Sequence, residues 1–424
     1  EQDFIPSLVK NISITPHVLG LGFRDHADAL KTAGLHTKHA SPLRSLMRWM
    51  IRILIGDASQ PTFPFRLSEL HRKVRGFAPD VIYTTMGSYA VHKIVLYLSR
   101  KMKIPVVVHV MDDWVVAKNN HGLLSRLQGW LIRRTFADLL RVSSLRYVIS
   151  EGMKSAYEQR YGYRFNVLGN VVEDTWITKG NVPDNRDMLS IGYVGSFTDN
   201  SQREPIEDVV KAICDLNEDD GVRKFKLKLF VTPATYQFAS KCFEAHPDVG
   251  VGVAPVDDAD FYMLLSSFDL LLLPSSFTGP SKDYIKYSVP AKFYSYLAAG
   301  VVVLYYGDSE SEQIRLAIDN NLGLVVTDRA SSAIQDALKK FVGDPSAVQD
   351  CLDRQYEFIR KNHDANLIRK SLYRSYQECF YPKAVVPQTE AGSGYDHHLL
   401  TKKRRLIDAL IEKIKPRSIL DFGG

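Results

Sequence analysis

Short apolar runs alternate with longer amphipathic stretches along most of the chain. This alternation is typical of α/β proteins with parallel sheets, so the pattern predicts a doubly wound domain in the first part of the sequence. The strands expected there lie at about 12–21, 80–85, 105–110 and 146–149, with helices at 88–102 and 122–141.

A second alternation of the same kind follows a polar connector at 170–185. Its expected strands lie at about 189–195, 226–232, 249–253, 269–273, 301–305 and 323–326, and residues 345–380 are expected to be helical throughout. We therefore predict two Rossmann-like domains, at 1–172 and 186–380, that face each other across a cleft. Ligands of open parallel sheets bind at the carboxyl ends of the strands, so the loops there are the candidate site.

Composition narrows the class of protein. Of the 424 residues, 45% are hydrophobic and 24% are charged, which excludes a disordered, collagenous or coiled-coil chain. No long apolar window lacks a charge, so no membrane-spanning helix is expected. The cysteines form no C-x-x-C pair, which argues against a disulfide scaffold and favours the cytoplasm; they are Cys214, Cys242, Cys351 and Cys379. The first expected strand follows a helix-like stub, so we expect the opening strand of the first domain to be missing.

The net charge of +6 is spread unevenly. Residues 41–56 place Arg44, Arg48 and Arg52 on one stripe of a helix that carries tryptophan and aliphatic side chains elsewhere, and residues 118–146 are also basic. Such a helix is suited to an anionic membrane surface, and we expect peripheral association through it at the inner face of the cell membrane. The alternative is a domain helix with a solvated arginine edge.

The segment 272–307 is the most informative for chemistry. A buried strand is followed by a loop rich in Ser, Gly and Lys, and Ser288-Val289-Pro290 then predicts a helix start with Ser288 as the N-cap. Lys292 lies one turn into that helix, where free N–H groups and an ammonium can receive a phosphate. The alternative is a well-capped structural helix with a solvated lysine.

The run Ser288-x-Pro290-x-Lys292-x-x-x-Tyr296-Leu297-Ala298-Ala299-Gly300 resembles a helix of family-4-like glycosyltransferases with the GT-B fold. Three further stretches resemble that family in the same order along the chain. They are 148–153 with 161–162 and 167–170, then 191–197, then 270–274. The resemblance implies a GT-B fold and transfer of a sugar from a nucleotide-diphosphate donor such as a UDP-, GDP- or dTDP-sugar, without a further cofactor.

The resemblance also implies donor-binding residues. Gly195 and Ser196 would approach the diphosphate through their backbone, and Lys292 and Arg203 would neutralise it. The family commonly has two glutamates eight positions apart, of which one contacts the sugar and the other the ribose. Those positions are Tyr287 and Ser295 here, so this chain departs from the family pattern.

Asp112 and Asp113 follow the apolar strand at 105–110 and are the candidate catalytic residues on the acceptor side. A carboxylate at the end of a parallel strand can receive a proton from, or orient, an acceptor hydroxyl. The alternatives are a helix N-cap for one Asp and a core position for the nearby His109. Asp112-Asp113 and Asp257-Asp258 are adjacent pairs whose side chains would diverge in a strand, so we expect transfer without a metal ion, helped by basic side chains and helix dipoles.

The end of the chain carries a second resemblance. A linker at 381–394 and a basic amphipathic helix at 399–414 precede Ile419-Leu420-Asp421-Phe422-Gly423-Gly424. That run resembles the opening strand and glycine turn of class I methyltransferases that use S-adenosylmethionine. We expect residues 395–424 to be the truncated start of such a domain, in a longer parent protein.

Two functions follow from these patterns. The first is a retaining GT-B glycosyltransferase that extends a cell-envelope polysaccharide, such as a lipopolysaccharide, or a lipid-linked glycan. The alternative is a non-catalytic GT-B-like domain that binds a glycan or positions the methyltransferase, which the two missing glutamates favour. A nucleic-acid protein rests on the basic patches alone and ranks last.

Overall fold

The computed structural model describes residues 71–380, apart from residues 73, 77–78, 86–88, 114, 116–122, 185, 199–200, 219–222 and 279–285. The predicted strand at 12–21, the arginine helix at 41–56, the linker and the methyltransferase-like end lie outside the described residues. The boundaries of the two domains remain predictions, whereas the two sheets inside them are described directly.

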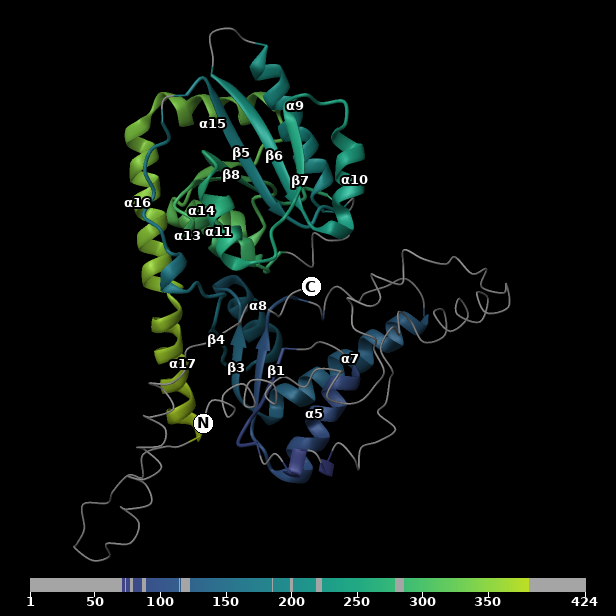
Figure 1. Cartoon of the computed structure of the whole chain (residues 1–424). Coiled ribbons are helices and arrows are strands. Elements are labelled where there is room, and N and C mark those ends of the chain that lie inside the picture. Colours follow the sequence, from purple (N-terminus) through teal and green to yellow (C-terminus); the bar gives the residue numbers. More distant parts are fainter. Residues whose placement is uncertain are drawn as a thin grey trace, which may run out of the picture.

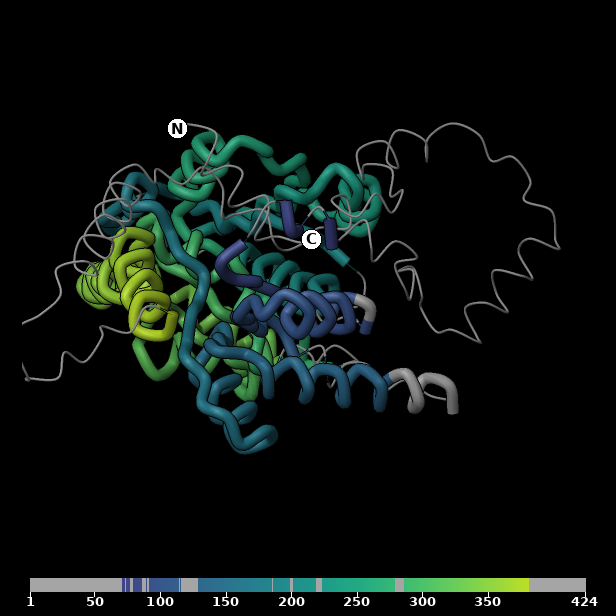
Figure 2. The backbone as a smooth tube through the Cα atoms, turned by 90° about the horizontal axis from the view of Figure 1, so that it is seen from below, coloured from purple at the N-terminus to yellow at the C-terminus, as the bar shows by residue number. Residues whose placement is uncertain are grey.

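The first sheet is parallel, with strand order β1-β2-β3-β4. Its strands are β1 (Ile82–Thr84), β2 (Val106–Val110), β3 (Ser143–Val148) and β4 (Asn166–Val167). All five residues of β2 are buried, as expected for a parallel strand that is covered on both faces. The helices of this unit are α5 (Tyr89–Met102), α7 (Leu123–Val142) and α8 (Glu151–Tyr161). Figure 2 shows α5 and α7 side by side, where they pack against each other.

The second sheet is also parallel, with strand order β10-β9-β8-β5-β6-β7. Its strands are β5 (Met188–Gly195), β6 (Lys224–Val231), β7 (Val249–Val253), β8 (Leu270–Pro274), β9 (Val302–Tyr306) and β10 (Leu324–Val326). The chain crosses from one half of the sheet to the other between β7 and β8. The strands β5 and β8, which lie side by side, therefore mark the point where the strand order reverses, and such points are where open sheets bind ligands.

Helices cover both faces of the second sheet. They are α9 (Arg203–Asn217), α10 (Pro233–Phe243), α11 (Asp258–Ser266), α13 (Ala291–Ala298), α14 (Glu312–Asn320) and α15 (Ser331–Gly343). One buried cluster joins the sheet to α9, α10 and α15, and another joins its opposite face to α11, α13 and α14. Figure 1 shows this unit above the first one.

The last described segment returns to the first unit. It consists of α16 (Pro345–Asn362) and α17 (Ala365–Phe380), which corrects the prediction of one helical stretch over 345–380. Between these helices, Val172 N donates to His363 O at 2.8 Å and Ala365 N donates to Val172 O at 2.9 Å. The helical stretch is therefore interrupted where its backbone forms hydrogen bonds with the connector. Figure 1 shows α16 beside the second unit and α17 beside the first. The thiol of Cys379 lies 3.8 Å from Ser144 O at the start of β3.

The predicted alternation is confirmed within the described residues. β7 has the predicted bounds, and most other predicted strands are displaced by one or two residues. Two differences are larger. β3 begins three residues before the prediction, and β4 was not predicted because two residues leave no periodicity to detect. The described helices are all too short or too polar to cross a bilayer, and all four cysteines are free thiols.

Candidate functional site

The carboxyl end of β5 and the first turn of α13 bring two predicted donor-binding residues together. The ammonium of Lys292 donates a hydrogen bond of 2.9 Å to the hydroxyl of Tyr193 and lies 4.4 Å from the centre of that ring. The Tyr193 hydroxyl in turn donates to the carbonyl of Ser196. The side chain of Lys292 is thereby held over the turn that follows β5.

Gly195 makes room for this lysine. A Cβ atom at Gly195 would lie 2.6 Å from Lys292 Nζ, and its φ of 150° lies in a region that side chains other than glycine rarely adopt. The adjoining backbone is fixed from α13 as well, because the hydroxyl of Tyr296 contacts both Val194 N (2.8 Å) and Val194 O (3.1 Å). The glycine turn and the lysine therefore form one rigid unit.

The charge of Lys292 is poorly compensated. Among the described residues, no carboxylate forms an ion pair with its ammonium, and its one hydrogen bond goes to the neutral Tyr193 hydroxyl. Burial lowers the pKa of Lys292, because an ammonium in a low-dielectric site loses its hydration. An anion bound beside Gly195 would supply the missing counter-charge.

The start of α13 differs from the prediction. The helix begins at Ala291, and its N-cap is Pro290 rather than Ser288, with φ −65° and ψ 145°. A residue before proline is pushed out of the helical region, and the ring itself offers no capping oxygen. Ser288 lies two residues before that cap and is buried. Lys292 is therefore the second residue of the helix and lies closer to its free N–H groups than expected.

The two positions where the family carries glutamates serve other contacts. Ser295 is buried, and its hydroxyl accepts a hydrogen bond of 3.4 Å from Tyr262, whose ring stacks on Trp176. Tyr287 packs against the core of the first unit, and its carbonyl accepts from the Ser150 hydroxyl at 2.9 Å. The predicted donor contacts of Tyr287 and Ser295 therefore compete with roles in packing that the structure shows directly.

Arg203, the other predicted diphosphate ligand, is the first residue of α9, the helix that follows β5. Its Nε donates to Glu207 at 2.7 Å, and its guanidinium lies 5.9 Å from the centre of the Phe238 ring. Arg203 thus lies at the predicted edge of the sheet, but part of its charge is already neutralised within α9.

Asp113 is an internal anion. Its side chain is 1% exposed, accepts from the hydroxyl of Tyr157 at 2.8 Å, and receives two hydrogen bonds from Arg160, at 2.9 and 3.1 Å. Burial, together with the neighbouring Asp113 carboxylate, raises the pKa of Tyr157, so its phenol stays protonated and donates. Both carboxylate oxygens hold α8 against the end of β2, so the predicted catalytic role of Asp113 competes with a structural one that the structure shows directly.

Asp112 remains the candidate on the acceptor side. It is the second residue after β2, is half-buried, and makes no hydrogen bond or ion pair among the described residues. His109, three residues earlier in β2, is a core residue. Its Nε2 donates to Leu168 O at 2.9 Å. The other ring nitrogen, Nδ1, therefore accepts from the Tyr83 hydroxyl at 2.5 Å. The core alternative for His109 is thus the correct one.

The two neighbouring aspartates should respond differently to amide substitution. Asp113→Asn removes the negative charge that accepts hydrogen bonds from Arg160 and Tyr157. We expect this change to lower the free energy of unfolding by about 2 kcal/mol in urea titrations. Asp112→Asn is the matched control for stability, and it should leave that free energy unchanged. If both variants lose stability equally, Asp112 is also structural.

The second acidic pair lies on a helix start rather than on a strand. Asp257 is the N-cap of α11, and its Oδ1 accepts from Ala259 N at 2.8 Å. Asp258 and Asp260 follow in the first turn at the spacing Asp-x-Asp, which is a common metal-binding spacing in loops but separates side chains around a helix. Within the described part of the chain, no three His, Cys, Asp or Glu side chains are grouped as metal ligands.

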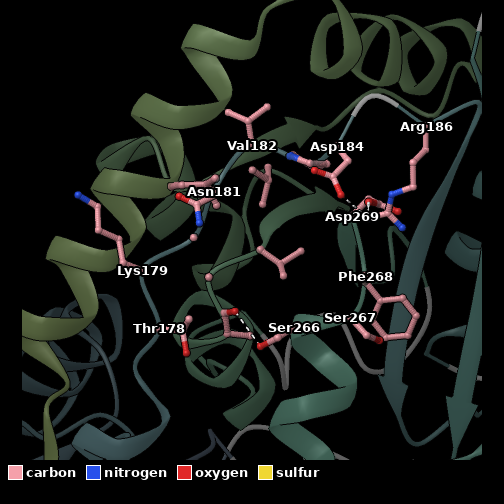
Figure 3. Close-up of a pocket in the computed structure, with 17 residues that line it drawn as sticks. Thr178, Lys179, Asn181, Val182, Asp184, Arg186, Ser266, Ser267, Phe268 and Asp269 are labelled. Carbon is pink, nitrogen blue, oxygen red and sulfur yellow. Dashed lines mark hydrogen bonds and ion pairs between the residues drawn. The ribbon is translucent and has the colours of Figure 1, made fainter.

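A pocket of about 270 Å³ lies at the opposite edge of the second sheet, at the amino ends of β8 and β9. Figure 3 shows that the connector forms one wall, with Arg186 beside Asp269, and that Ser266 and Ser267 at the end of α11 form another. Arg186 and Asp269 form an ion pair of 3.2 Å. None of the predicted site residues lines this pocket, so it is separate from the Lys292 site.

The loops at the carboxyl ends of both sheets contact each other. Besides the bond between Ser150 and Tyr287, Gly152 N in the first turn of α8 donates to a carboxylate oxygen of Glu312 at 2.8 Å. Glu312 begins α14, the next helix after β9, and forms an ion pair with Arg315. The sequence carried no signal for Glu312, because its partner lies 160 residues away. This contact places the first unit against the edge that carries Lys292.

No protein-family model matches the chain, and no curated protein sequence matches it. Solved structures do, at low identity. Sucrose-phosphate synthase from Thermosynechococcus elongatus is similar with a TM-score of 0.56 and 14% identity, over 75% of this chain and 78% of that one.

Two further structures give the same result. A glycosyltransferase from Rickettsia africae has a TM-score of 0.55 at 12% identity, over 75% of this chain and 81% of that one. HepE of Anabaena, crystallised in complex with UDP, has a TM-score of 0.54 at 12% identity, over 74% of this chain and 82% of that one. At these identities the likeness concerns the fold. With two parallel α/β units that meet at the carboxyl ends of their strands, the chain has the GT-B fold.

Proposed function

We propose that the chain is a glycosyltransferase that transfers a sugar from a nucleoside diphosphate sugar. The observation that carries this proposal is the ammonium of Lys292, which lies over Gly195 at the reversal point of the second sheet and has no carboxylate partner among the described residues. The nucleoside diphosphate that leaves in glycosyl transfer is the anion that such a site fits. Preorganised positive groups stabilise this charge as the glycosidic bond breaks.

Roles follow for the other predicted residues. The N–H groups at the start of α13 and the backbone of Gly195 and Ser196 approach the diphosphate, and Arg203 assists from the start of α9. Asp112 faces the acceptor hydroxyl as a general base or an orienting group. One neighbour of the same fold, HepE of Anabaena, was crystallised with UDP and with UDP-glucose, which supports a UDP-sugar as the first donor to try.

A panel of donors tests this function. We expect the protein to bind and turn over at least one of UDP-, GDP- and dTDP-sugars, measured as release of the nucleoside diphosphate. The proposal includes transfer without a metal ion, so activity should persist in excess EDTA. Complete and reversible loss in EDTA would reject the metal-independent part alone, whereas no turnover with any donor would reject the enzyme.

The second candidate is a GT-B-like domain that binds a glycan without catalysis. It is favoured by Ser295 and Tyr287, which occupy the glutamate positions and take part in packing instead. Carbohydrate binding without nucleotide turnover would support it. The family resemblance also implies that the anomeric configuration of the sugar is retained, and this expectation depends on the same positions, 287 and 295. The anomeric form of the product tests it.

We further propose that the acceptor is a cell-envelope polysaccharide, such as a lipopolysaccharide, or a lipid-linked glycan, reached from the inner face of the membrane, within a parent protein that continues into a methyltransferase. The arginine stripe of 41–56 supports the membrane contact. So does α7, which exposes Trp130, Arg133 and Arg134. Co-sedimentation with anionic liposomes should weaken when Arg44, Arg48 and Arg52 are all changed to Glu; unchanged sedimentation would remove the membrane from the proposal.

A further inference from the structure

Three neighbouring strands of the second sheet end at the same level. Tyr306 pairs with Pro274 at the ends of β9 and β8, and β5 pairs with β8 in parallel register. Ser275 follows β8 directly, and its N–H donates to Tyr306 O at 2.8 Å. Neighbouring strands lie about 4.8 Å apart, so Ser275 lies roughly one sugar ring from the glycine turn that holds Lys292.

Two buried polar atoms at this edge lack partners. The hydroxyl of Ser275 and the side-chain oxygen of Gln313 have no hydrogen-bond partner among the described residues, although the two residues are only 4% and 5% exposed. The two residues are neighbours, because the side-chain nitrogen of Gln313 lies 3.5 Å from the carbonyl oxygen of Pro274, the residue before Ser275. Leaving such an atom unsatisfied costs about 1–3 kcal/mol, so each calls for a ligand or another explanation.

Both side chains are fixed in place. A Cβ atom at Gly307 would lie 2.4 Å from the Cβ of Ser275, so the end of β9 presses directly against this serine. Gln313 is the second residue of α14, and the preceding Glu312 binds Gly152 N of the first unit and donates its own N–H to Lys286 O at 3.0 Å. The pair therefore lies where the two units meet, at the same edge as Lys292.

We propose that Ser275 and Gln313 bind hydroxyl groups of the sugar that is transferred, an assignment that rests on the proposed function. An amide oxygen needs a donor, which a phosphate ester at neutral pH does not offer and a sugar hydroxyl does. The same hydroxyl, or its neighbour on the ring, can accept from Ser275. Lys292 then binds the diphosphate of the donor, and the Ser275–Gln313 pair binds the hydroxyl groups of its sugar.

The test compares a nucleotide sugar with the bare diphosphate. Calorimetric titration of UDP-glucose, GDP-mannose and dTDP-glucose, beside UDP, GDP and dTDP, first identifies the pair of ligands that the wild type binds. In Gln313→Leu and in Ser275→Ala we expect the Kd of the nucleotide sugar to rise about tenfold, while the Kd of the matching diphosphate changes less than twofold.

A matched serine controls for side-chain removal. Ser276 is equally buried, but its hydroxyl donates to Thr278 O at 2.6 Å, so Ser276→Ala should leave the ratio of the two Kd values at the wild-type value. Thermal unfolding provides a second measurement. Because the Ser275 hydroxyl bonds to nothing in the described protein, Ser275→Ala should not lower the melting temperature of the free protein, whereas a purely structural serine would.

The outcomes separate the two proposals. If the wild type binds no nucleotide, the proposed function fails, and this inference fails with it. If the wild type binds nucleotide sugars and Gln313→Leu and Ser275→Ala keep the wild-type Kd ratio, only the inference is overturned. An equal loss of sugar nucleotide and diphosphate would also overturn it, since the pair would then contact the nucleotide.

Discussion

Replacing Lys292 with methionine should reduce kcat/KM for the nucleotide sugar by about 10²–10³-fold, which corresponds to roughly 3–4 kcal/mol of lost transition-state stabilisation. Methionine keeps an unbranched apolar stem of similar length and removes the ammonium that lies over Gly195. Arg203 can compensate only in part, because it lies on another helix and part of its charge is neutralised by Glu207. Steady-state kinetics with the donor identified in the panel measure the effect.

The control for this variant is Lys286→Met. Lys286 lies close by in the sequence but has a partly exposed side chain, and its ammonium is 3.7 Å from a carboxylate oxygen of Glu310. We expect this change to leave kcat/KM within about twofold, because surface ion pairs contribute little. Lys292→Met with full activity would place the diphosphate elsewhere and remove the main support for the enzyme.

The pH dependence of donor binding gives an independent check on Lys292. Only the ammonium form attracts the diphosphate, and burial lowers the pKa of Lys292 from its ordinary value of 10.5. Affinity for the diphosphate should therefore decline with rising pH already below pH 10.5. The same decline should be absent in Lys292→Met, whose remaining affinity does not depend on this group.

Acidification from pH 6.5 to pH 4 should remove several kcal/mol of stability through the buried His109 and the half-buried His363. Burial lowers the pKa of His109 and of His363 to about 4, against 6.5 in an ordinary setting. Between these values the unfolded chain binds protons that the folded protein does not, so the free energy of unfolding falls as pH falls. The contribution is complete above pH 6.5, and each histidine accounts for about 3 kcal/mol over the full range.

These histidines act on one short segment. His109 donates to Leu168 O at 2.9 Å, and His363 Nδ1 lies 3.0 Å from Asn170 O, so both hold the residues through which the chain leaves the first sheet. Between them, a Cβ on Gly169 would lie 3.1 Å from the His363 ring, so the segment is tightly packed. Protonation of either ring adds a charge that this apolar junction cannot solvate, and the junction between the two units should loosen first.

Urea titrations at several pH values measure this effect. His109→Gln and His363→Gln should each flatten the decline between pH 6.5 and pH 4, even where they cost stability at neutral pH. The exposed His246 provides the control, and His246→Gln should keep the wild-type slope. Parallel slopes in all variants would show that acid acts through other groups.

The sequence was most informative about the sheets. Continuous apolar runs such as VVVHV in β2 and LLLLP in β8 can be buried on both faces only in a parallel sheet covered by helices, so period and length sufficed to predict them. The helix that carries Lys292 was predicted as well, although its start was placed two residues too early. Proline is common in the first turn of a helix, which is where the prediction placed Pro290, but here it directly precedes the first helical residue.

The roles of adjacent side chains were decided by tertiary contacts. Asp112 and Asp113 have the same chemistry and the same local sequence, yet only Asp113 meets Arg160 and Tyr157, which lie more than forty positions away in the chain. Likewise, Ser275 and Ser276 are both buried serines, and only their neighbours show that one is satisfied and the other is not. Such differences depend on which residues another element brings within 3 Å.

The sequence alone predicted two parallel α/β units, which the structure confirms, and it placed a lysine at a helix start, where we propose that it meets a phosphate. Both follow from periodicity and from short-range backbone chemistry, which act within a few residues. The tertiary structure decided that Lys292 lies over Gly195 without a carboxylate partner among the described residues, that Asp113 is internal, and that Glu312 joins the two units. Those results depend on distances between residues that are remote in the chain. A side chain is buried or paired only once the fold has brought such residues together.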